Sequence, residues 1–206
     1  MTRPIFTRPW IAFDTETTGL PQDEWARVVE IGGVVVERDG SLGLSFSTLC
    51  RPHEPIDARA DEALDINRIA RADIAAAPPI EAAWSQFVRW TRTQFGYAKA
   101  EADARGAVHH VPMALAGWVS GFDVEMLLRD GCSFADVWPG HALTILDYQP
   151  IIADIHKPTK GRRYRLVHAA ERCKVTLPEG MAPHRAIADC TLLGLTVAAT
   201  FQPGFR

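Results

Sequence analysis

WIAFDTETTGL, residues 10–20, is an apolar run that ends in two carboxylates and a turn. The apolar residues are typical of a buried strand. Alternate side chains of a strand point to the same face, so Asp14 and Glu16 are expected to share one small volume. Two carboxylates at such a short separation repel each other unless a cation lies between them. The pattern therefore favours a site for a divalent ion. The alternative is a pair of solvated residues at a strand end, because a D-x-E triplet is short.

A second acidic position lies near the other end of the chain. His184 and Asp189 follow Pro183 in a stretch whose apolar residues recur at helical spacing. A helix that begins just after Pro183 would place His184 at its start and Asp189 more than a turn further in. Both could then approach one ion, Asp189 as a ligand and His184 as a proton acceptor. Taken alone, His184 is a surface or capping histidine and Asp189 an ordinary helix residue.

Asp123 is the third candidate for a metal-binding carboxylate. Residues 115–128 begin with apolar residues, break at Ser120-Gly121 and continue with apolar residues at helical spacing. This pattern predicts a strand, a short turn and a helix with Asp123 in its first turn. Such a residue also has a simpler role, because a carboxylate there can satisfy free backbone amides.

The order of these motifs resembles that of the DEDDh 3′–5′ exonucleases, the DnaQ-like family. The resemblance covers about residues 10–200, and residues 27–35 also look like the second strand of that family. It implies an α/β, ribonuclease H-like fold, with a central mixed β-sheet flanked by helices. It also implies that two Mg²⁺ or Mn²⁺ ions are held by four carboxylates, with His184 as the general base. The four implied ligands are Asp14, Glu16, Asp123 and Asp189.

One motif departs from the family pattern. Many members have a His-Asn pair shortly before the middle aspartate, where this chain has Trp118-Val119-Ser120-Gly121. The metal ligand itself is unaffected. The contacts that the asparagine would make to backbone or substrate are the part of the family pattern that this chain does not reproduce.

The resemblance also implies where the nucleic acid binds. The backbone of Thr17, Thr18 and Gly19 would receive the terminal 3′-hydroxyl, and Leu20 would wedge against the last base; alternatively, Leu20 only anchors the turn. Residues 157–165 carry five positive charges and a tyrosine. Such a segment, which includes Arg162 and Arg163, could bind strand phosphates, although a solvated loop is the simpler reading.

Composition agrees with a single exonuclease domain over residues 1–206. A chain of 206 residues with 47% hydrophobic content can bury one core. A net charge of −3 is unlike a nonspecific nucleic-acid coat protein, so local basic patches would have to attract the substrate. Residues 97–110 read as an exposed insertion. The four cysteines show no C-x-x-C spacing, and no apolar stretch approaches ~20 residues, so a cytoplasmic protein without membrane contact is expected.

The pattern of apolar residues predicts strands first and helices later. Strands are expected near residues 10–16, 26–37 and 42–51, before Asp123, and near 143–146. Helices are expected near 60–71 and 79–94 and again late in the chain. Glu30 lies inside the second apolar run and is interpreted as a structural group, not a ligand.

The function predicted from these features is metal-dependent hydrolysis of phosphodiester bonds from the 3′ end of single-stranded nucleic acid. The products would be nucleoside 5′-monophosphates. DNA is the favoured substrate. The alternatives are an exoribonuclease or oligoribonuclease that acts on short RNA, and a polymerase-associated proofreading or binding subunit with little activity alone.

Overall fold

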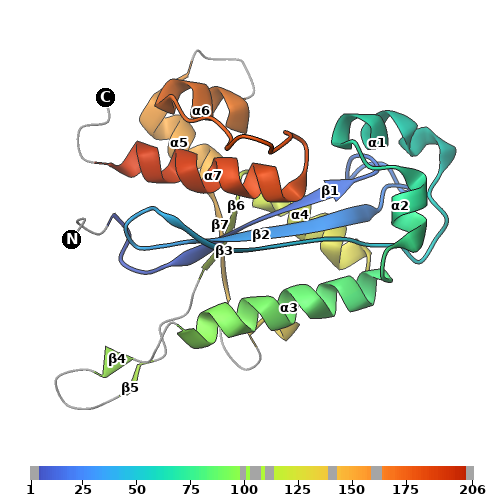
Figure 1. Cartoon of the computed structure of the whole chain (residues 1–206), viewed down its shortest axis with the longest axis horizontal. Coiled ribbons are helices and arrows are strands. Elements are labelled where there is room, and N and C mark those ends of the chain that lie inside the picture. Colours follow the sequence, from blue (N-terminus) through green and yellow to red (C-terminus); the bar gives the residue numbers. More distant parts are fainter. Residues whose placement is uncertain are drawn as a thin grey trace.

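A computed structural model describes residues 5–97, 101–102, 108–109, 114–138, 143–158 and 164–202. It contains a five-stranded mixed sheet with strand order β3-β2-β1-β6-β7 (Figure 1). Strands β1 to β3 are antiparallel, whereas β6 and β7 run parallel to β1. The bounds are β1 Trp10–Thr17, β2 Val28–Val36, β3 Leu42–Leu49, β6 Ala114–Gly117 and β7 Thr144–Asp147. All five strands expected from the sequence are therefore present.

Helices cover both faces of this sheet (Figure 1). The helices α3 and α4 pack on one face, where Phe87 and Met126 join Phe13 in a buried cluster. The helices α5, α6 and α7 pack on the other face, where Leu193 joins Trp10. The bounds are α3 Ile80–Tyr97, α4 Ser120–Arg129, α5 Tyr148–His156, α6 Leu166–Cys173 and α7 Ala186–Phe201. The predicted α/β class, a mixed sheet flanked by helices, is confirmed.

The helix expected over residues 60–71 is wrong as one element. The structure has α1, Asp61–Asn67, and α2, Arg71–Ala76, after a short 3-10 turn at Ala58–Ala60. Arg68 ends α1 with a left-handed backbone, φ 55°. Its amide donates back to the carbonyls of Leu64 and Asp65, which closes the helix. Both short helices lie beside the end of the sheet at which β1 finishes (Figure 1).

The expected insertion at 97–110 lies largely outside the described residues. Within it, β4, Glu101–Ala102, and β5, Val108–His109, pair as a separate two-stranded antiparallel ladder. A second 3-10 turn, Phe134–Asp136, follows α4.

Gly32 of β2 sets how closely α7 approaches the sheet. A Cβ atom at this position would lie 2.6 Å from the backbone carbonyl carbon of Ala186, the first residue of α7. Real Cβ atoms do not come this close to backbone, so any side chain here must displace the start of the helix. The glycine therefore lets α7 begin directly against β2.

We expect Gly32→Ala to destabilise the fold by about 1–3 kcal/mol, the usual cost of forcing atoms into a packed interior. The matched control is Gly121→Ala in α4, where an added Cβ meets nothing within 4 Å. That change should be neutral or stabilising by up to about 1 kcal/mol, because alanine favours a helix. Thermal unfolding of both variants measures the difference, and equal melting temperatures would contradict the close packing.

Candidate active site

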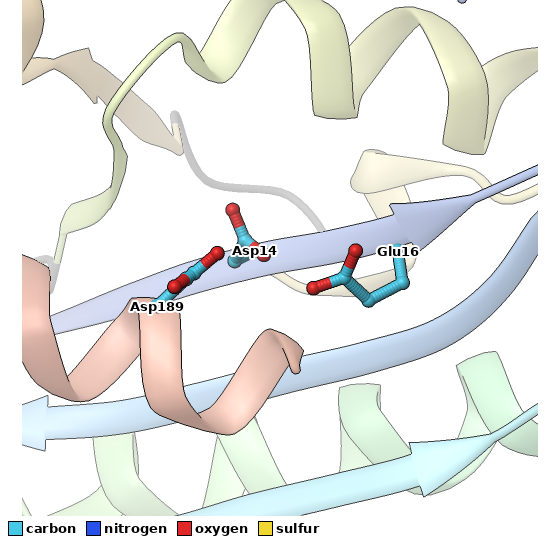
Figure 2. A group of neighbouring side chains, drawn as sticks. All are labelled: Asp14, Glu16 and Asp189. Atoms are coloured by element: carbon cyan, nitrogen blue, oxygen red, sulfur yellow. The ribbon is translucent and has the colours of Figure 1, made fainter. Parts of the chain in front are cut away.

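Three carboxylates converge where β1 ends and α7 begins. Asp14 and Glu16 project from the same face of β1, and Asp189 comes from the first turn of α7 (Figure 2). Each contributes an oxygen atom, and the three oxygens lie within 4.8 Å of one another. The alternation of side chains along β1 and the position of α7 thus bring together residues from opposite ends of the chain.

Burial and mutual repulsion make this group electrostatically unfavourable without a cation. Burial is the main cause that raises the pKa of Asp14 well above its ordinary range, and Asp123 and Asp189 add to it by repulsion. Burial also raises the pKa of Glu16 to about 8, with further repulsion from Asp189. One Glu16 oxygen, Oε1, is buried and has no hydrogen-bond partner among the described residues.

These features fit a divalent metal ion. Carboxylate oxygens are the ligands that hard cations such as Mg²⁺ and Mn²⁺ prefer. A cation would neutralise the clustered charges and satisfy the unpartnered oxygen of Glu16. Asp14, Glu16 and Asp189 are therefore the residues suited to hold it.

We expect divalent ions to stabilise the protein more strongly as the pH rises from 4.5 to about 8. Because the pKa of Glu16 is raised on folding, the folded metal-free protein keeps a proton that the unfolded chain loses, so its stability falls with pH in this window. A cation that binds only the folded site restores that stability. The melting temperature with Mg²⁺ minus that with EDTA should therefore widen with pH. Glu16→Gln should reduce the trend without abolishing it, because the pKa values of Asp14 and Asp123 are raised as well. A melting-temperature difference that becomes smaller as the pH rises would contradict the prediction.

Asp123 lies beside the three-carboxylate group, in the first turn of α4 as predicted. Its Oδ1 accepts hydrogen bonds from the Thr15 backbone amide at 3.0 Å and the Thr15 hydroxyl at 2.8 Å. Strand β6 pairs with β1 only over Trp10–Ala12, so Asp123 takes the place of a strand partner further along. Burial raises the pKa of Asp123 to about 7, although the Thr15 hydrogen bonds oppose this.

His184 is exposed and lies just before α7, not within it. The helix begins at Ala186, so the expected start immediately after Pro183 is wrong by two residues, and Asp189 lies in the first turn. His184 has a left-handed backbone, φ 59°. Burial raises the pKa of Asp189, and the electrostatic effect of His184 and a hydrogen bond from its backbone oppose this rise. The predicted ligand and the predicted base are thus neighbours in space.

Arg185 is a part of the site that the sequence analysis did not assign. It is the N-cap residue of α7 and pairs with Glu30 of β2, whose side chain is fully buried. A signal was present in the sequence, because a positive charge at a helix N-terminus is unfavourable unless an anion is close to it. Glu30 therefore pairs with Arg185, which agrees with its interpretation as a structural group.

The turn after β1 is fastened by its own polar groups. The Thr17 hydroxyl donates to the Gly19 carbonyl at 2.8 Å, and the Thr18 hydroxyl accepts from the Arg27 amide at 2.8 Å. The Thr18 amide donates to the Arg27 carbonyl at 2.9 Å, and the Leu20 amide donates to Asp23 at 2.9 Å. The two threonine hydroxyls thus build the turn, and only part of its backbone is left to meet a ligand.

A cavity of about 540 Å³ opens beside this turn and the carboxylates. Leu20 lines it with half of its surface exposed, and so does Ile66 of α1. Phe122, which precedes Asp123, lines it from α4. The remaining lining residues are Thr15, Glu16, Thr17, Thr18, Gly19, Asp23, Trp25, Arg59, Glu62, Ala63 and Asn67.

Arg162 and Arg163 lie outside the described residues. The chain that follows them is anchored, because the carbonyl of Tyr164 accepts hydrogen bonds from Trp118 Nε1 at 3.2 Å and from Gln149 Nε2 at 2.9 Å. Trp118 stands where many family members have the His-Asn pair. Its side chain is buried, and it holds the backbone of Tyr164.

The mixed sheet, the helices on both faces and the carboxylates at the end of β1 define a ribonuclease H-like α/β protein with a nuclease-type acidic site. The family model for exonucleases, RNase_T, matches residues 11–194. The chain therefore belongs to this exonuclease family, and the resemblance to the DEDDh exonucleases is confirmed. A comparison with curated proteins finds no match. Among the described residues, no helix has both the length and the apolar character needed to span a membrane.

Solved structures share the fold at low sequence identity. Exonuclease X in complex with 5′-overhanging duplex DNA is 22% identical with a TM-score of 0.59, over 93% of this chain and 90% of that one. The nuclease domain of 3′hExo, a DEDDh family member bound to rAMP, is 14% identical with a TM-score of 0.72, over 96% and 93%. The zinc-bound complex of E. coli ExoI with single-stranded DNA is 17% identical with a TM-score of 0.65, over 94% of this chain but only 40% of that one.

Proposed function

We propose that this protein is a divalent-metal-dependent 3′–5′ exonuclease that shortens single-stranded nucleic acid and releases nucleoside 5′-monophosphates. The observation that carries the proposal is the group formed by Asp14, Glu16 and Asp189, which adjoins a cavity of about 540 Å³. An acidic site would repel a phosphodiester unless a metal ion neutralised it. The metal ion and the nucleic-acid strand therefore have to bind together at this group of carboxylates.

The proposed ligands are the three grouped carboxylates together with Asp123. Mg²⁺ or Mn²⁺, two ions per site, would be held there. Bound cations would stabilise the negative charge that develops on the attacking and leaving oxygens. The task of the protein is to keep four carboxylates in place against their own repulsion, and the hydrogen bonds from Thr15 to Asp123 contribute to this.

His184 is the proposed general base. It is exposed, and its backbone contacts the Asp189 carboxylate, so its imidazole would act on a water molecule at the edge of the carboxylate group. Imidazole suits this role because it exchanges a proton near neutral pH. The nucleophile is then a water molecule that loses its proton to His184 as it attacks phosphorus.

The cavity is the proposed binding site for the terminal nucleotide. Leu20, Ile66 and Phe122 supply apolar surface against which a base can stack. The half-exposed side chain of Leu20 favours a contact with the base over a role as a buried anchor of the turn. The backbone of Thr17, Thr18 and Gly19 would receive the terminal hydroxyl. The segment with Arg162 and Arg163 would bind phosphates further along the strand.

DNA is the proposed substrate, and short RNA is the alternative. Exonuclease X and E. coli ExoI share the fold of this chain, and their structures contain DNA. The nuclease domain of 3′hExo also shares the fold, and its structure contains rAMP. A third reading is a polymerase-associated proofreading or binding subunit. We further propose that residues 1–206 act as one exonuclease domain.

The direct test is digestion of 5′-labelled single-stranded DNA and RNA of one sequence with Mg²⁺, Mn²⁺ or EDTA. We expect a ladder that shortens from the 3′ end, depends on metal and favours DNA. A ladder from RNA alone would support the exoribonuclease. Absence of cleavage in every metal would contradict a free-standing exonuclease and favour the partner-dependent subunit.

A further inference from the structure

Glu30 is a buried carboxylate that the proposed chemistry does not use. Its side chain has 0% exposure, and both of its carboxylate oxygens accept hydrogen bonds. Arg185 donates to it twice, from Nε at 2.9 Å and from Nη2 at 2.9 Å. The Ala186 backbone amide donates at 3.2 Å and the Ser47 hydroxyl at 2.9 Å. A carboxylate so fully engaged is unsuited to bind a metal ion, although Glu30 is the direct cross-strand neighbour of Glu16.

We propose that Glu30 and Arg185 form a positioning clamp that fixes the start of α7, and through it Asp189 and His184, against β1. The clamp acts on the metal site without touching it. This inference rests on the proposed function, because it assigns the clamp the task of setting the geometry of the metal-binding carboxylates.

The clamp supplies what the start of α7 lacks. The first amides of a helix have no partners within the helix, and Arg185, the N-cap residue, makes no side-chain capping bond. Glu30, in β2, takes the role of the missing cap because its carboxylate accepts a hydrogen bond from the Ala186 amide. Its negative charge also suits the positive end of the helix dipole.

Arg185 passes this constraint to the residues on either side. Its guanidinium is held by Glu30, while its carbonyl accepts from the Asp189 amide at 3.0 Å. His184 is its immediate predecessor and adopts a left-handed backbone that its neighbours must hold in place. A shift of Arg185 would therefore move both residues relative to Asp14 and Glu16.

Stability alone is a poor explanation for this pair. Glu30 is fully buried, but the Arg185 side chain is 34% exposed, and ion pairs contribute little net stability whether they are exposed or buried. The gain from this two-bonded pair is a fixed orientation. Partners behind metal ligands are typically worth about 10–100-fold in metal affinity or activity.

The test is Mn²⁺ binding by calorimetry to the full chain and to Glu30→Gln, Arg185→Met and the double variant. We expect each single change to weaken Mn²⁺ binding by about tenfold or more. The double variant should lose no more than either single change, because both remove one clamp. In the nuclease assay kcat should fall with little change in KM, because neither residue lines the cavity.

The matched control is Ser47→Ala, which removes one hydrogen bond to Glu30 but keeps both contacts with Arg185 and Ala186. It should bind Mn²⁺ within about twofold of the unchanged protein, well below the effect expected for a lost clamp. Affinity that is unchanged in both single variants, or that falls equally in Ser47→Ala, overturns the clamp. Arg185→Lys keeps the charge without the two-bonded fork and should recover part of the affinity lost in Arg185→Met.

Failure of the clamp and failure of the proposed function give different results. If the unchanged protein cleaves nucleic acid and Glu30→Gln binds Mn²⁺ normally, the clamp is wrong and the function stands. If the unchanged protein cleaves nothing, Mn²⁺ affinity still decides the clamp.

Discussion

Replacing Asp14 with asparagine is expected to lower kcat/KM by more than about 1,000-fold, because even a residue behind a ligand is worth about 10–100-fold. Asp14 is one of the grouped carboxylates, and burial, followed by repulsion from Asp123 and Asp189, raises its pKa. Asparagine keeps the shape but removes the charge that attracts the ion. A direct ligand should therefore matter more than a residue that only supports one.

The same change should stabilise the metal-free protein at pH 8. Removal of one buried charge relieves the repulsion among the remaining carboxylates. Activity and stability then move in opposite directions, which simple misfolding cannot produce. The control is Asp154→Asn on the exposed surface of α5, which should change neither quantity. Activity of Asp14→Asn near that of the unchanged protein at ordinary Mg²⁺ would contradict the ligand role.

The second large effect is expected for His184→Asn, which should lower kcat by about 100- to 10,000-fold, the usual range for loss of a general base. Asparagine tolerates the left-handed backbone at this position, where φ is 59°. The fold and Mn²⁺ binding should therefore survive while the proton acceptor is lost. A drop in Mn²⁺ affinity as large as the drop in kcat would instead make His184 a part of the metal site.

His184→Ala separates the backbone from the imidazole. Alanine at positive φ costs about 1–2 kcal/mol, so this variant should be less stable than His184→Asn while both lose the same catalytic step. Glycine at this position should restore stability but not activity. Equal stability of all three variants would show that the left-handed backbone exerts no constraint.

The fold could be predicted wherever the chain carries long apolar runs. Val28 to Val36 is buried throughout, so an apolar pattern interrupted only by Glu30 marked β2 correctly. The break between α1 and α2 could not be predicted, because neither glycine nor proline marks the turn at Arg68. The apolar spacing continues across it and resembles one helix.

The closeness of Asp14 and Glu16 could be predicted from sequence, but the contacts that support the carboxylates could not. Asp14 and Glu16 share a strand, so alternation alone predicts that they converge. The hydrogen bonds from Thr15 to Asp123 join residues 108 positions apart, and the pair between Arg185 and Glu30 spans 155 positions. Contacts at such separation depend on the packing of whole elements, which local patterns do not encode.

Because β1 and α7 lie far apart along the chain, the order of synthesis limits when the acidic site can form. Asp14 and Glu16 leave the ribosome early in synthesis. Asp189 follows only after the residues of the sheet and of the other helices have been synthesised. A nascent chain that lacks α7 holds two of the three grouped carboxylates and leaves Glu30 without Arg185. We therefore expect the proposed nuclease to stay inactive during translation until α7 has emerged and docked on β2.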